Sequence, residues 1–371
     1  MTQCKFNGGK DISGCAIIGF INEDGTRCDG SDILSGISAM RERSNGLGGG
    51  FMAYGIYPDY KDFYAFHIMF ENPKIAEDVE KFLEEYFFVE LSEKIPHNHV
   101  DEISSHPLLQ RYFVKPKKSF HEPVLGHKFE DVTDDEYVAR AVFKINLEYD
   151  GAFVFSSGKD CGCFKGVGYP EEIGEFYKLK QYKAYCWMAH GRFPTNSQAW
   201  WGGAHPFSLL NISVVHNGEI SSYGINKRYL ENFGYKMTAG TDTEVIAYLF
   251  DLFTRKQKLD LKTTSDILAP PFWDEIEHMN PEKRDYYGKL RAIYGSALCN
   301  GPFGIVVGFD GGMVGLNDRI KLRPLVAARA KNRLYLGSEE CAIREANNFD
   351  AINKIWYPRG GEMVIGRVKK D

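Results

Sequence analysis

Apolar residues form short uninterrupted runs near both ends of the chain, and amphipathic stretches lie between them. Residues 15–21, closed by the polar turn 22–25, predict a fully buried strand. Residues 32–43 have apolar side chains at helical spacing and predict a helix. Further strands are predicted at 51–54, within 151–168, and at 304–309, 312–316, 325–328, 333–337 and 362–368. Strands at both ends with helical patterns between them favour an α+β layered-sheet protein over alternating βαβ units.

The pattern changes between residues 57 and 150. Residues 75–86 carry a charged helical pattern, and residues 96–123 contain several prolines and histidines without a clear period. We therefore expect an insertion at about 57–150 that is helical or irregular. Immediately after it, the Gly158-Lys159-Asp160 segment between two strand patterns predicts a hairpin turn.

Composition and charge exclude several classes of protein. The chain has 371 residues, with 45 Lys and Arg against 50 Asp and Glu, giving a net charge of -5. Nucleic acid is therefore not expected as the main partner, because phosphate binding needs a concentrated basic surface. The apolar runs are too short for a membrane span, and the start lacks the pattern of a secretion signal. We expect a cytoplasmic protein.

The cysteine spacing predicts neither a disulfide scaffold nor a metal centre. Eight cysteines are sparse for a chain of this length. Cys161 and Cys163 form the only close pair, and no second pair completes a zinc site. We expect most of the cysteines to be small buried hydrophobic residues, with Cys15 as the exception.

Three short motifs could carry chemistry, and each also has a structural interpretation. Arg192 follows an expected strand and is suited to gripping a carboxylate, although an ordinary surface arginine would fit the same pattern. Asn217-Gly218 lies between apolar runs and, taken alone, favours a hairpin turn, whereas the functional interpretation is that it supplies the two donors of an oxyanion hole. Thr241 and Glu244 have capping-box spacing, so a helix begins there with Asp242 at its first position. A carboxylate at that position favours the helix dipole, or it could receive a substrate ammonium group.

Taken together and in order, the motifs resemble those of the class II glutamine amidotransferases. The chain has C-A-I-I-G-F from Cys15, then G-R-F-P-T-N, A-H-P-F, H-N-G-E-I and T-D-T-E-V, and later N-G-P-F-G, D-R-I-K-L-R-P and G-S-E-E. The variants look most like the glutaminase portion of glutamate synthase. The resemblance leaves out the insertion at about 57–150.

The resemblance implies an N-terminal-nucleophile αββα sandwich over residues 15–371. Cys15 matches the nucleophile that becomes the first residue after processing, so residues 1–14 are expected to be a propeptide. A free α-amine then serves as the base for the thiol. The implied roles of the other matched residues are oxyanion binding by Asn217 and Gly218, binding of the glutamine α-carboxylate by Arg192, binding of the α-ammonium by Asp242, and lining of the pocket by Thr195. His205 and His216 also lie inside motifs, and we interpret them as structural.

The implied function is hydrolysis of glutamine through a Cys15 thioester, with the ammonia passed to a synthase partner. No cofactor is expected in this chain, whereas FMN and an iron–sulfur cluster are expected on a glutamate synthase-like partner. An assembly of several copies of the chain stays open. One alternative is a catalytically silent subunit that binds glutamine or regulates a partner. Another is a related hydrolase acting on a different amide, which the pairing of Arg192 with Asp242 disfavours.

Overall fold

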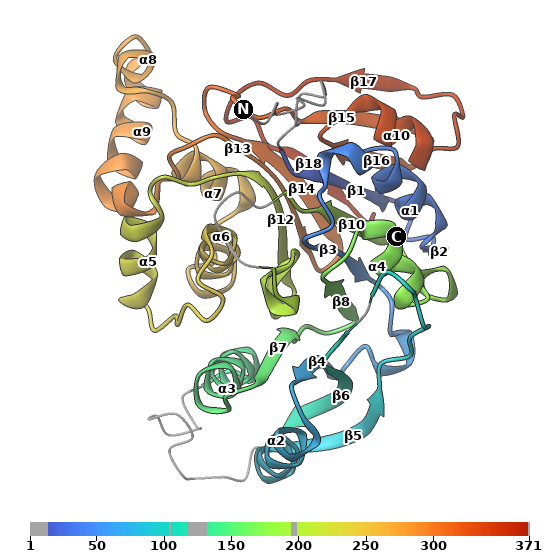
Figure 1. Cartoon of the computed structure of the whole chain (residues 1–371). Coiled ribbons are helices and arrows are strands. Elements are labelled where there is room, and N and C mark those ends of the chain that lie inside the picture. The colour runs from blue at the N-terminus through green and yellow to red at the C-terminus, as the bar shows by residue number, and fades with distance from the viewer. Residues whose placement is uncertain (1–13, 104, 118–131, 194–198, 370–371) are drawn as a thin grey trace, which may run out of the picture.

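A computed structural model describes residues 14–103, 105–117, 132–193 and 199–369. Its centre consists of two antiparallel sheets stacked face to face (Figure 1). The first sheet has the order β17-β15-β16-β1-β10-β3-β8, and the second has the order β11-β12-β13-β14-β18. The strands of the first sheet are β1 (Ala16–Asn22), β3 (Gly49–Tyr54), β8 (Cys161–Gly166), β10 (Cys186–Gly191), β15 (Val326–Ala330), β16 (Arg333–Gly337) and β17 (Lys354–Trp356). Those of the second are β11 (Phe207–Leu209), β12 (Ile212–Gly218), β13 (Phe303–Phe309), β14 (Gly312–Asn317) and β18 (Val364–Arg367).

Helices cover the outer side of each sheet (Figure 1). The first sheet is covered by α1 (Ser31–Ser38), α4 (Pro170–Phe176) and α10 (Glu340–Ala346). On the side of the second sheet lie α5 (Tyr223–Glu231), α6 (Asp242–Asp251), α7 (Leu261–Leu268), α8 (Trp273–Glu277) and α9 (Pro281–Tyr294), with α6 directly against β11 and β12. A small ribbon of β2 (Cys28–Asp29) and β9 (Lys183–Ala184) flanks the first sheet. The expected α+β class and αββα sandwich are confirmed.

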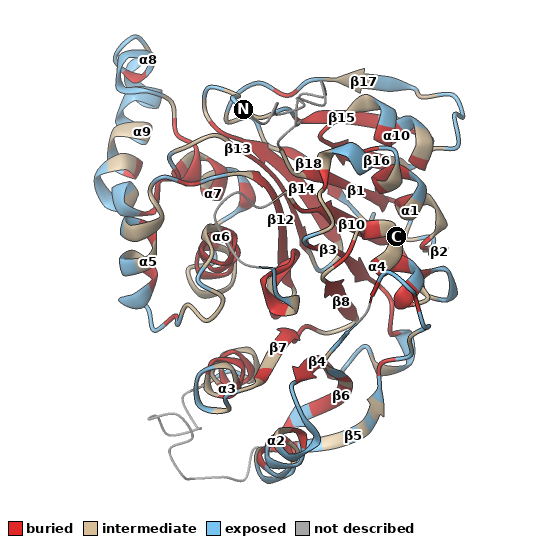
Figure 2. Cartoon of the chain, viewed as in Figure 1, coloured by how far each residue is buried: buried red, intermediate tan, exposed pale blue. Residues whose placement is uncertain are grey.

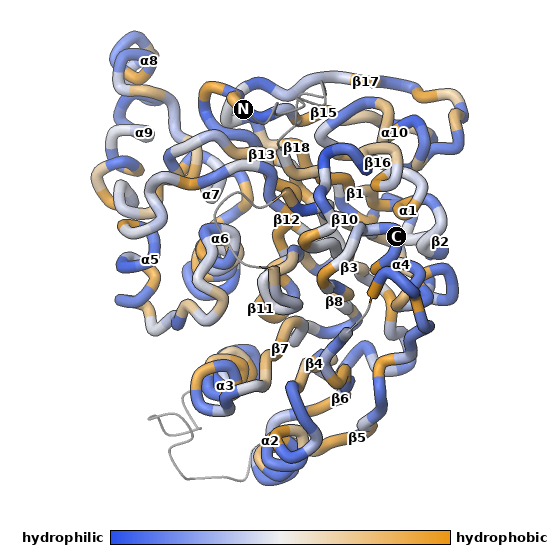
Figure 3. The backbone as a smooth tube through the Cα atoms, viewed as in Figure 1, coloured by the Kyte–Doolittle hydropathy of each residue, from blue (hydrophilic) through white to orange (hydrophobic). Residues whose placement is uncertain are grey.

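The inner strands are apolar on both faces because both faces are covered. All seven residues of β1 are buried, which explains the continuous apolar run in the sequence. Figure 2 shows the buried strands at the centre, and Figure 3 shows apolar segments along them with hydrophilic segments around the outer helices. Gly19 allows the sheets to approach closely, because a Cβ there would lie 2.9 Å from Met313 Sδ of the facing sheet.

The insertion contains a sheet of its own, so the expectation of a helical or irregular segment was incomplete. It has the two helices α2 (Pro73–Tyr86) and α3 (Asp134–Glu148) and the strands β4 (Tyr64–Phe70), β5 (Phe87–Lys94) and β6 (Leu108–Pro116), which with β7 (Ala152–Ser156) form a sheet of order β5-β6-β4-β7. The apolar run of β4 is buried on both faces. The sheet was missed because its strand partners are separated by helices and loops, so local periodicity does not reveal the pairing.

The insertion shares its hydrophobic core with the sandwich. Ala65 and Met69 of β4 belong to the same cluster of buried residues as Phe20 of β1. On the other face of β4, Phe66 belongs to a second cluster that reaches Leu249 of α6. The insertion is therefore packed into the molecule from both faces of β4.

The predicted hairpin turn at Gly158-Lys159-Asp160 was wrong. β7 pairs with β4 in the insertion sheet, whereas β8 pairs with β3 in the first sheet of the sandwich. The segment between them thus crosses from one sheet to another. Both strands take partners from earlier in the chain, and these long-range pairings override the local turn signal.

Within the described part of the chain, no helix combines the length and apolar character needed to cross a membrane.

Candidate active site

Strand pairing brings Cys15 and Arg192 to one edge of the first sheet, where β1 begins and β10 ends. Ala16 at the start of β1 pairs with Gly191 at the end of β10. Cys15 immediately precedes the first of these strands and Arg192 immediately follows the second. Because the strands are antiparallel, the beginning of one lies beside the end of the other.

A cavity of about 330 Å³ lies at this edge. Its lining includes four of the predicted site residues, namely Cys15, Arg192, Gly218 and Asp242. Asn217 is fully buried beside Gly218 and is not part of the lining. Thr195 lies outside the described residues, as do residues 1–13 of the expected propeptide. The remaining lining residues are Phe193, Gly203, His205, His216, Glu219, Ile220, Gly240, Thr241 and Thr243.

The Cys15 thiol accepts one backbone hydrogen bond and lies near several guanidinium groups. The Phe193 N–H donates to Cys15 Sγ at 3.5 Å. Arg43 Nε donates to the Cys15 carbonyl oxygen at 3.3 Å. Burial raises the pKa of the thiol, while the Phe193 hydrogen bond and the neighbouring guanidinium groups, beginning with Arg192, act in the opposite direction without cancelling it. The thiol is therefore mainly protonated at neutral pH and needs a base for nucleophilic attack.

Arg192 is fixed in place through its backbone. Its N–H donates to the Gly48 carbonyl at 2.9 Å, and its own carbonyl accepts from Ser44 Oγ at 3.1 Å. Gly48 has φ +153°, and a Cβ there would lie 3.0 Å from Arg192 Cδ, so the glycine makes room for the arginine. Burial lowers the pKa of Arg192, which nevertheless stays charged at any physiological pH.

The hairpin interpretation of Asn217-Gly218 was wrong. Both residues end β12, where they pair with Gly304 and Phe303 of β13, and residues 219–302 with helices α5 to α9 lie between the two strands. Gly218 has φ +134°, and a Cβ there would lie 1.9 Å from the Pro302 carbonyl oxygen. This position therefore requires glycine on two independent grounds.

The Asn217 side chain is linked to the strand that follows Cys15. Its Nδ2 lies 3.5 Å from Ser338 Oγ, and Ser338 Oγ accepts from the Ile17 N–H at 3.2 Å. Asn217 of the second sheet is thus connected to β1 of the first sheet, the strand that follows Cys15.

Asp242 is the first residue of α6, as predicted. The Thr241 hydroxyl oxygen accepts from the Glu244 N–H at 3.2 Å and caps the helix. Asp242 Oδ2 accepts from the Ile220 N–H at 2.9 Å, and Oδ1 accepts from the Thr243 hydroxyl at 3.3 Å. Burial acts to raise the pKa of Asp242, but His216 and these hydrogen bonds outweigh it and hold the pKa below its ordinary value. The carboxylate is therefore ionised at neutral pH.

Two histidines converge on one hydroxyl beside Asp242. His205 Nε2 lies 2.8 Å and His216 Nδ1 lies 3.1 Å from Thr243 Oγ1. His190 stacks on His205 with ring centroids 3.9 Å apart, and burial is the main cause that lowers the pKa of His190 to about 3. The structural role expected for His205 and His216 fits these contacts, which support Asp242 through Thr243, although both histidines also line the cavity.

The sequence did not single out Arg43, Phe193 or Thr243. Thr243 lies inside the T-D-T-E motif, so its position was available as a signal. Phe193 contributes through its backbone N–H, and the pattern of side chains in a sequence does not reveal such a contribution. Arg43 ends a predicted helix, where a basic residue is expected for the helix dipole alone.

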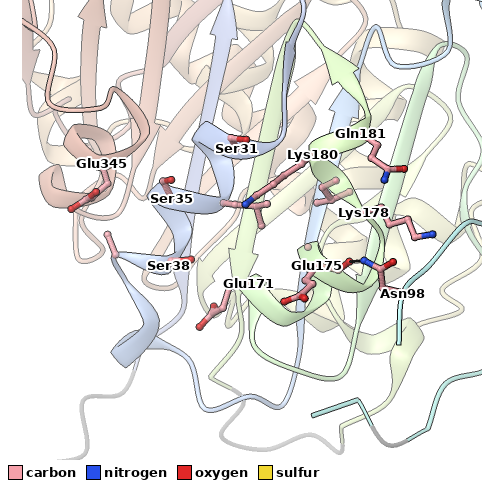
Figure 4. A pocket seen from close by; sticks show the side chains of 14 residues that line it. Ser31, Ser35, Ser38, Asn98, Glu171, Glu175, Lys178, Lys180, Gln181 and Glu345 are labelled. Atoms are coloured by element: carbon pink, nitrogen blue, oxygen red, sulfur yellow. Dashed lines mark hydrogen bonds between the residues drawn. The ribbon is translucent and has the colours of Figure 1, made fainter. Parts of the chain in front are cut away.

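A second cavity, of about 910 Å³, lies between α1 and α4 on the outer face of the first sheet (Figure 4). It is lined by polar side chains such as Ser35, Glu175 and Lys180 and contains none of the predicted site residues. The smaller cavity therefore holds the candidate chemistry. There a thiol, a guanidinium and a carboxylate surround a space suited to a small zwitterion with an electrophilic group.

Comparison with known proteins places this site in a family. The family model described as "Glutamine amidotransferases class-II" matches residues 94–370, a range that includes every predicted site residue except Cys15. An "Uncharacterized protein" of Archaeoglobus fulgidus is 49% identical over 363 residues, covering 97% of this chain and 94% of that protein.

Two relatives with named functions are more distant. The glutamate synthase [NADPH] large chain of Bacillus subtilis is 28% identical over 236 residues, covering 56% of this chain and 15% of that protein. The amidophosphoribosyltransferase of Methanocaldococcus jannaschii is 26% identical over 192 residues, covering 51% of this chain and 35% of that protein. The match thus spans only a minor part of each of these two proteins. Because the family model matches residues 94–370, well over half of the sequence, the chain belongs to the class II glutamine amidotransferases.

Proposed function

We propose that this chain hydrolyses glutamine to glutamate and ammonia, with Cys15 as nucleophile, and passes the ammonia to a synthase partner. The observation that carries the proposal is the shared cavity of Cys15, Arg192 and Asp242. A guanidinium and an ionised carboxylate beside a thiol suit an α-amino acid whose side chain ends in an amide.

Arg192 is proposed to bind the glutamine α-carboxylate and Asp242 the α-ammonium group. A guanidinium can donate two parallel hydrogen bonds to a carboxylate. Asp242 retains acceptor capacity on both oxygens beyond the bonds from Ile220 and Thr243. The lowered pKa of Asp242 supports this role because a charged acceptor is needed for an ammonium group.

The chemistry proposed for Cys15 proceeds through a thioester. Removal of residues 1–14 would free the Cys15 α-amine, which takes the thiol proton as sulfur attacks the amide carbon. The oxyanion of the tetrahedral intermediate is proposed to be bound by the Asn217 side-chain amide and the Gly218 N–H. The ammonium proton is then given to the leaving nitrogen, ammonia departs, and water hydrolyses the thioester to glutamate with the same amine as base.

We further propose that the ammonia acceptor is a glutamate synthase-like subunit carrying FMN and an iron–sulfur cluster. The support is the resemblance of the motifs to the glutaminase portion of glutamate synthase and the similarity to the B. subtilis large chain. The partner can be tested by purifying the native complex and recording its flavin spectrum. Recovery of this chain alone, with a full rate of ammonia release, would contradict the partner proposal.

Ammonia release from glutamine by the purified protein tests the activity. Wild-type protein should form glutamate and ammonia in equal amounts, and Cys15→Ser should abolish the normal rate. Cys341→Ser is the matched control, because Cys341 is an exposed thiol on α10 and does not line the cavity. N-terminal sequencing of active protein should begin at Cys15. Full activity in protein that begins at Met1 would contradict the mechanism, and stable binding of glutamine without turnover would favour the silent regulatory subunit.

A further inference from the structure

A lysine is buried beside the candidate active site without lining it. The Lys165 residue on β8 is 1% exposed. Its Nζ donates to the carbonyl oxygens of Gly202 at 2.8 Å and Pro206 at 3.1 Å. The ammonium also lies 4.5 Å from the centre of the Phe207 ring. Burying an ammonium is unfavourable unless its donors are satisfied, so these contacts compensate for its lost hydration.

The two carbonyls belong to the two ends of a segment that forms one wall of the cavity. Within residues 202–206, Gly203 and His205 line that cavity. His205 then contacts Thr243, and Thr243 donates to Asp242. Lys165 therefore connects β8 to Asp242 through three successive contacts.

This wall has little freedom to move. At Gly50, a Cβ would lie 2.2 Å from the His205 carbonyl oxygen and 2.6 Å from Lys165 Cβ. Backbone and side chains are in close contact here, so a change at Lys165 is transmitted to residues 202–206.

A buried carboxylate holds a second segment of the wall. The Glu244 residue is 2% exposed. Its Oε1 accepts from the N–H groups of Thr238 at 2.7 Å and Ala239 at 3.0 Å, and its Oε2 accepts from the Gly240 N–H at 3.1 Å. Three successive N–H groups pointing at one carboxylate fix the loop that leads into Asp242. Gly240 and Thr241 of this loop line the active-site cavity.

Lys165 and Glu244 lie close together, but their side chains form hydrogen bonds with different backbone segments. Lys165 and Glu244 line the same small void behind the active site. Burial lowers the pKa of Lys165 to about 8, against the opposing influence of Cys163 and Glu244 and with a further lowering by Arg192. Lys165 donates to backbone carbonyl groups, and Glu244 accepts from backbone N–H groups and from the Thr238 and Tyr248 hydroxyls, so together they restrain both segments.

We propose that Lys165 and Glu244 are positioning residues for glutamine, acting by holding residues 202–206 and 238–241 around Asp242. This inference rests on the proposed function of the site. Both side chains bond backbone groups of these two segments, whereas Cys15 precedes β1 and Asn217 and Gly218 end β12. Loss of either charge should therefore weaken substrate binding more than it slows the chemical step.

Steady-state kinetics of Lys165→Met and Glu244→Gln test the proposal. Methionine keeps most of the length of lysine without its donors, and glutamine keeps the shape of glutamate while replacing one acceptor with a donor. Each variant should raise the KM for glutamine by about tenfold or more, as expected for the loss of hydrogen bonds to a charged group, with kcat little changed. Lys165→Arg, which retains charge and donors, should recover part of the lost affinity. Lys262→Met and Glu231→Gln, on the surface of α7 and α5, should leave both constants unchanged.

A binding measurement separates this inference from the proposed function. L-glutamate should protect Cys15 of the wild-type protein from iodoacetamide, with peptide mass spectrometry as the readout. The two positioning variants should alkylate at the wild-type rate without glutamate but need a higher glutamate concentration for protection. Absence of protection in the wild type would overturn the proposed function itself. The positioning role would be overturned if both variants kept the wild-type KM and needed no more glutamate for protection than the wild type. It would also be overturned if kcat and affinity fell equally and the melting temperature fell with them.

Discussion

The backbone N–H of Phe193 donates a hydrogen bond to Cys15 Sγ, with a nitrogen–sulfur distance of 3.5 Å. This contact joins the end of β10 to the residue before β1, two segments far apart in the chain. It also brings Arg192, the neighbour of Phe193, into electrostatic range of the sulfur. The same short segment thus affects both the thiol and the proposed carboxylate-binding group.

The alkylation rate of Cys15 should depend on pH in a way that reflects its burial. Burial raises the pKa of this thiol. The thiolate should therefore form at a higher pH than in an ordinary cysteine, whose pKa is about 8.5. Arg192→Ala should move the midpoint further up, since the guanidinium lowers the thiol pKa. Iodoacetamide labelling of the Cys15 peptide measures this midpoint when the pH series extends well above the ordinary thiol value of about 8.5. A midpoint below that of free cysteine would contradict the expected effect of burial.

Arg192→Ala and Asp242→Ala should each weaken the use of glutamine mainly through KM. Removing one partner of a desolvated charge pair typically costs about 2–5 kcal/mol, so we expect a loss of about 2 kcal/mol or more for each. Arg344→Ala and Asp285→Ala provide controls, because they remove surface charges of α10 and α9. Steady-state ammonia release gives both constants. If both active-site variants kept the wild-type KM, the binding roles of Arg192 and Asp242 would be refuted.

Asn217→Ala should lower kcat more than it raises KM. An oxyanion donor acts mainly on the tetrahedral intermediate, and loss of one donor typically lowers the rate by about 10²–10³. Melting curves are needed alongside the kinetics, because Asn217 is fully buried and also contacts Ser338. An intact kcat in a folded Asn217→Ala protein would rule out the oxyanion role of this side chain.

Gly218→Ala should disrupt the end of β12. The new Cβ would overlap the Pro302 carbonyl at 1.9 Å in addition to occupying a backbone conformation at φ +134°. Gly234→Ala is the matched control, since Gly234 also has a positive φ, +86°, but nothing lies within 4 Å of a Cβ there. We expect Gly234→Ala to destabilise by about 1 kcal/mol through backbone strain alone, and Gly218→Ala to destabilise clearly more. Similar melting temperatures for the two variants would contradict the steric argument.

Local sequence pattern predicted the elements that are defined by their own residues. The buried run at 15–21 became β1, and the Thr241 cap started α6 with Asp242 at its first position. Errors occurred where a partner lies far along the chain. Asn217-Gly218 resembles a hairpin turn because the sequence does not reveal that β12 pairs with β13 across five intervening helices.

The geometry of the candidate site was predictable only in part for the same reason. The motif resemblance identified Cys15, Arg192, Gly218 and Asp242, which the structure brings around one cavity. Glu244 was expected to complete a capping box with Thr241. Its buried carboxylate instead accepts hydrogen bonds from the N–H groups of residues 238–240, a pairing that helix spacing alone does not reveal.

The hydrophobic clusters shared by β4, β1 and α6 have a consequence for how the molecule unfolds. Ala65 and Phe66 are adjacent in β4, yet they belong to two different clusters that extend into the sandwich. Separating the insertion from the sandwich would expose apolar surface on both sides of β4. Partial unfolding of this kind would therefore cost much of the free energy of complete unfolding. The insertion and the sandwich are therefore expected to unfold together, as one cooperative unit.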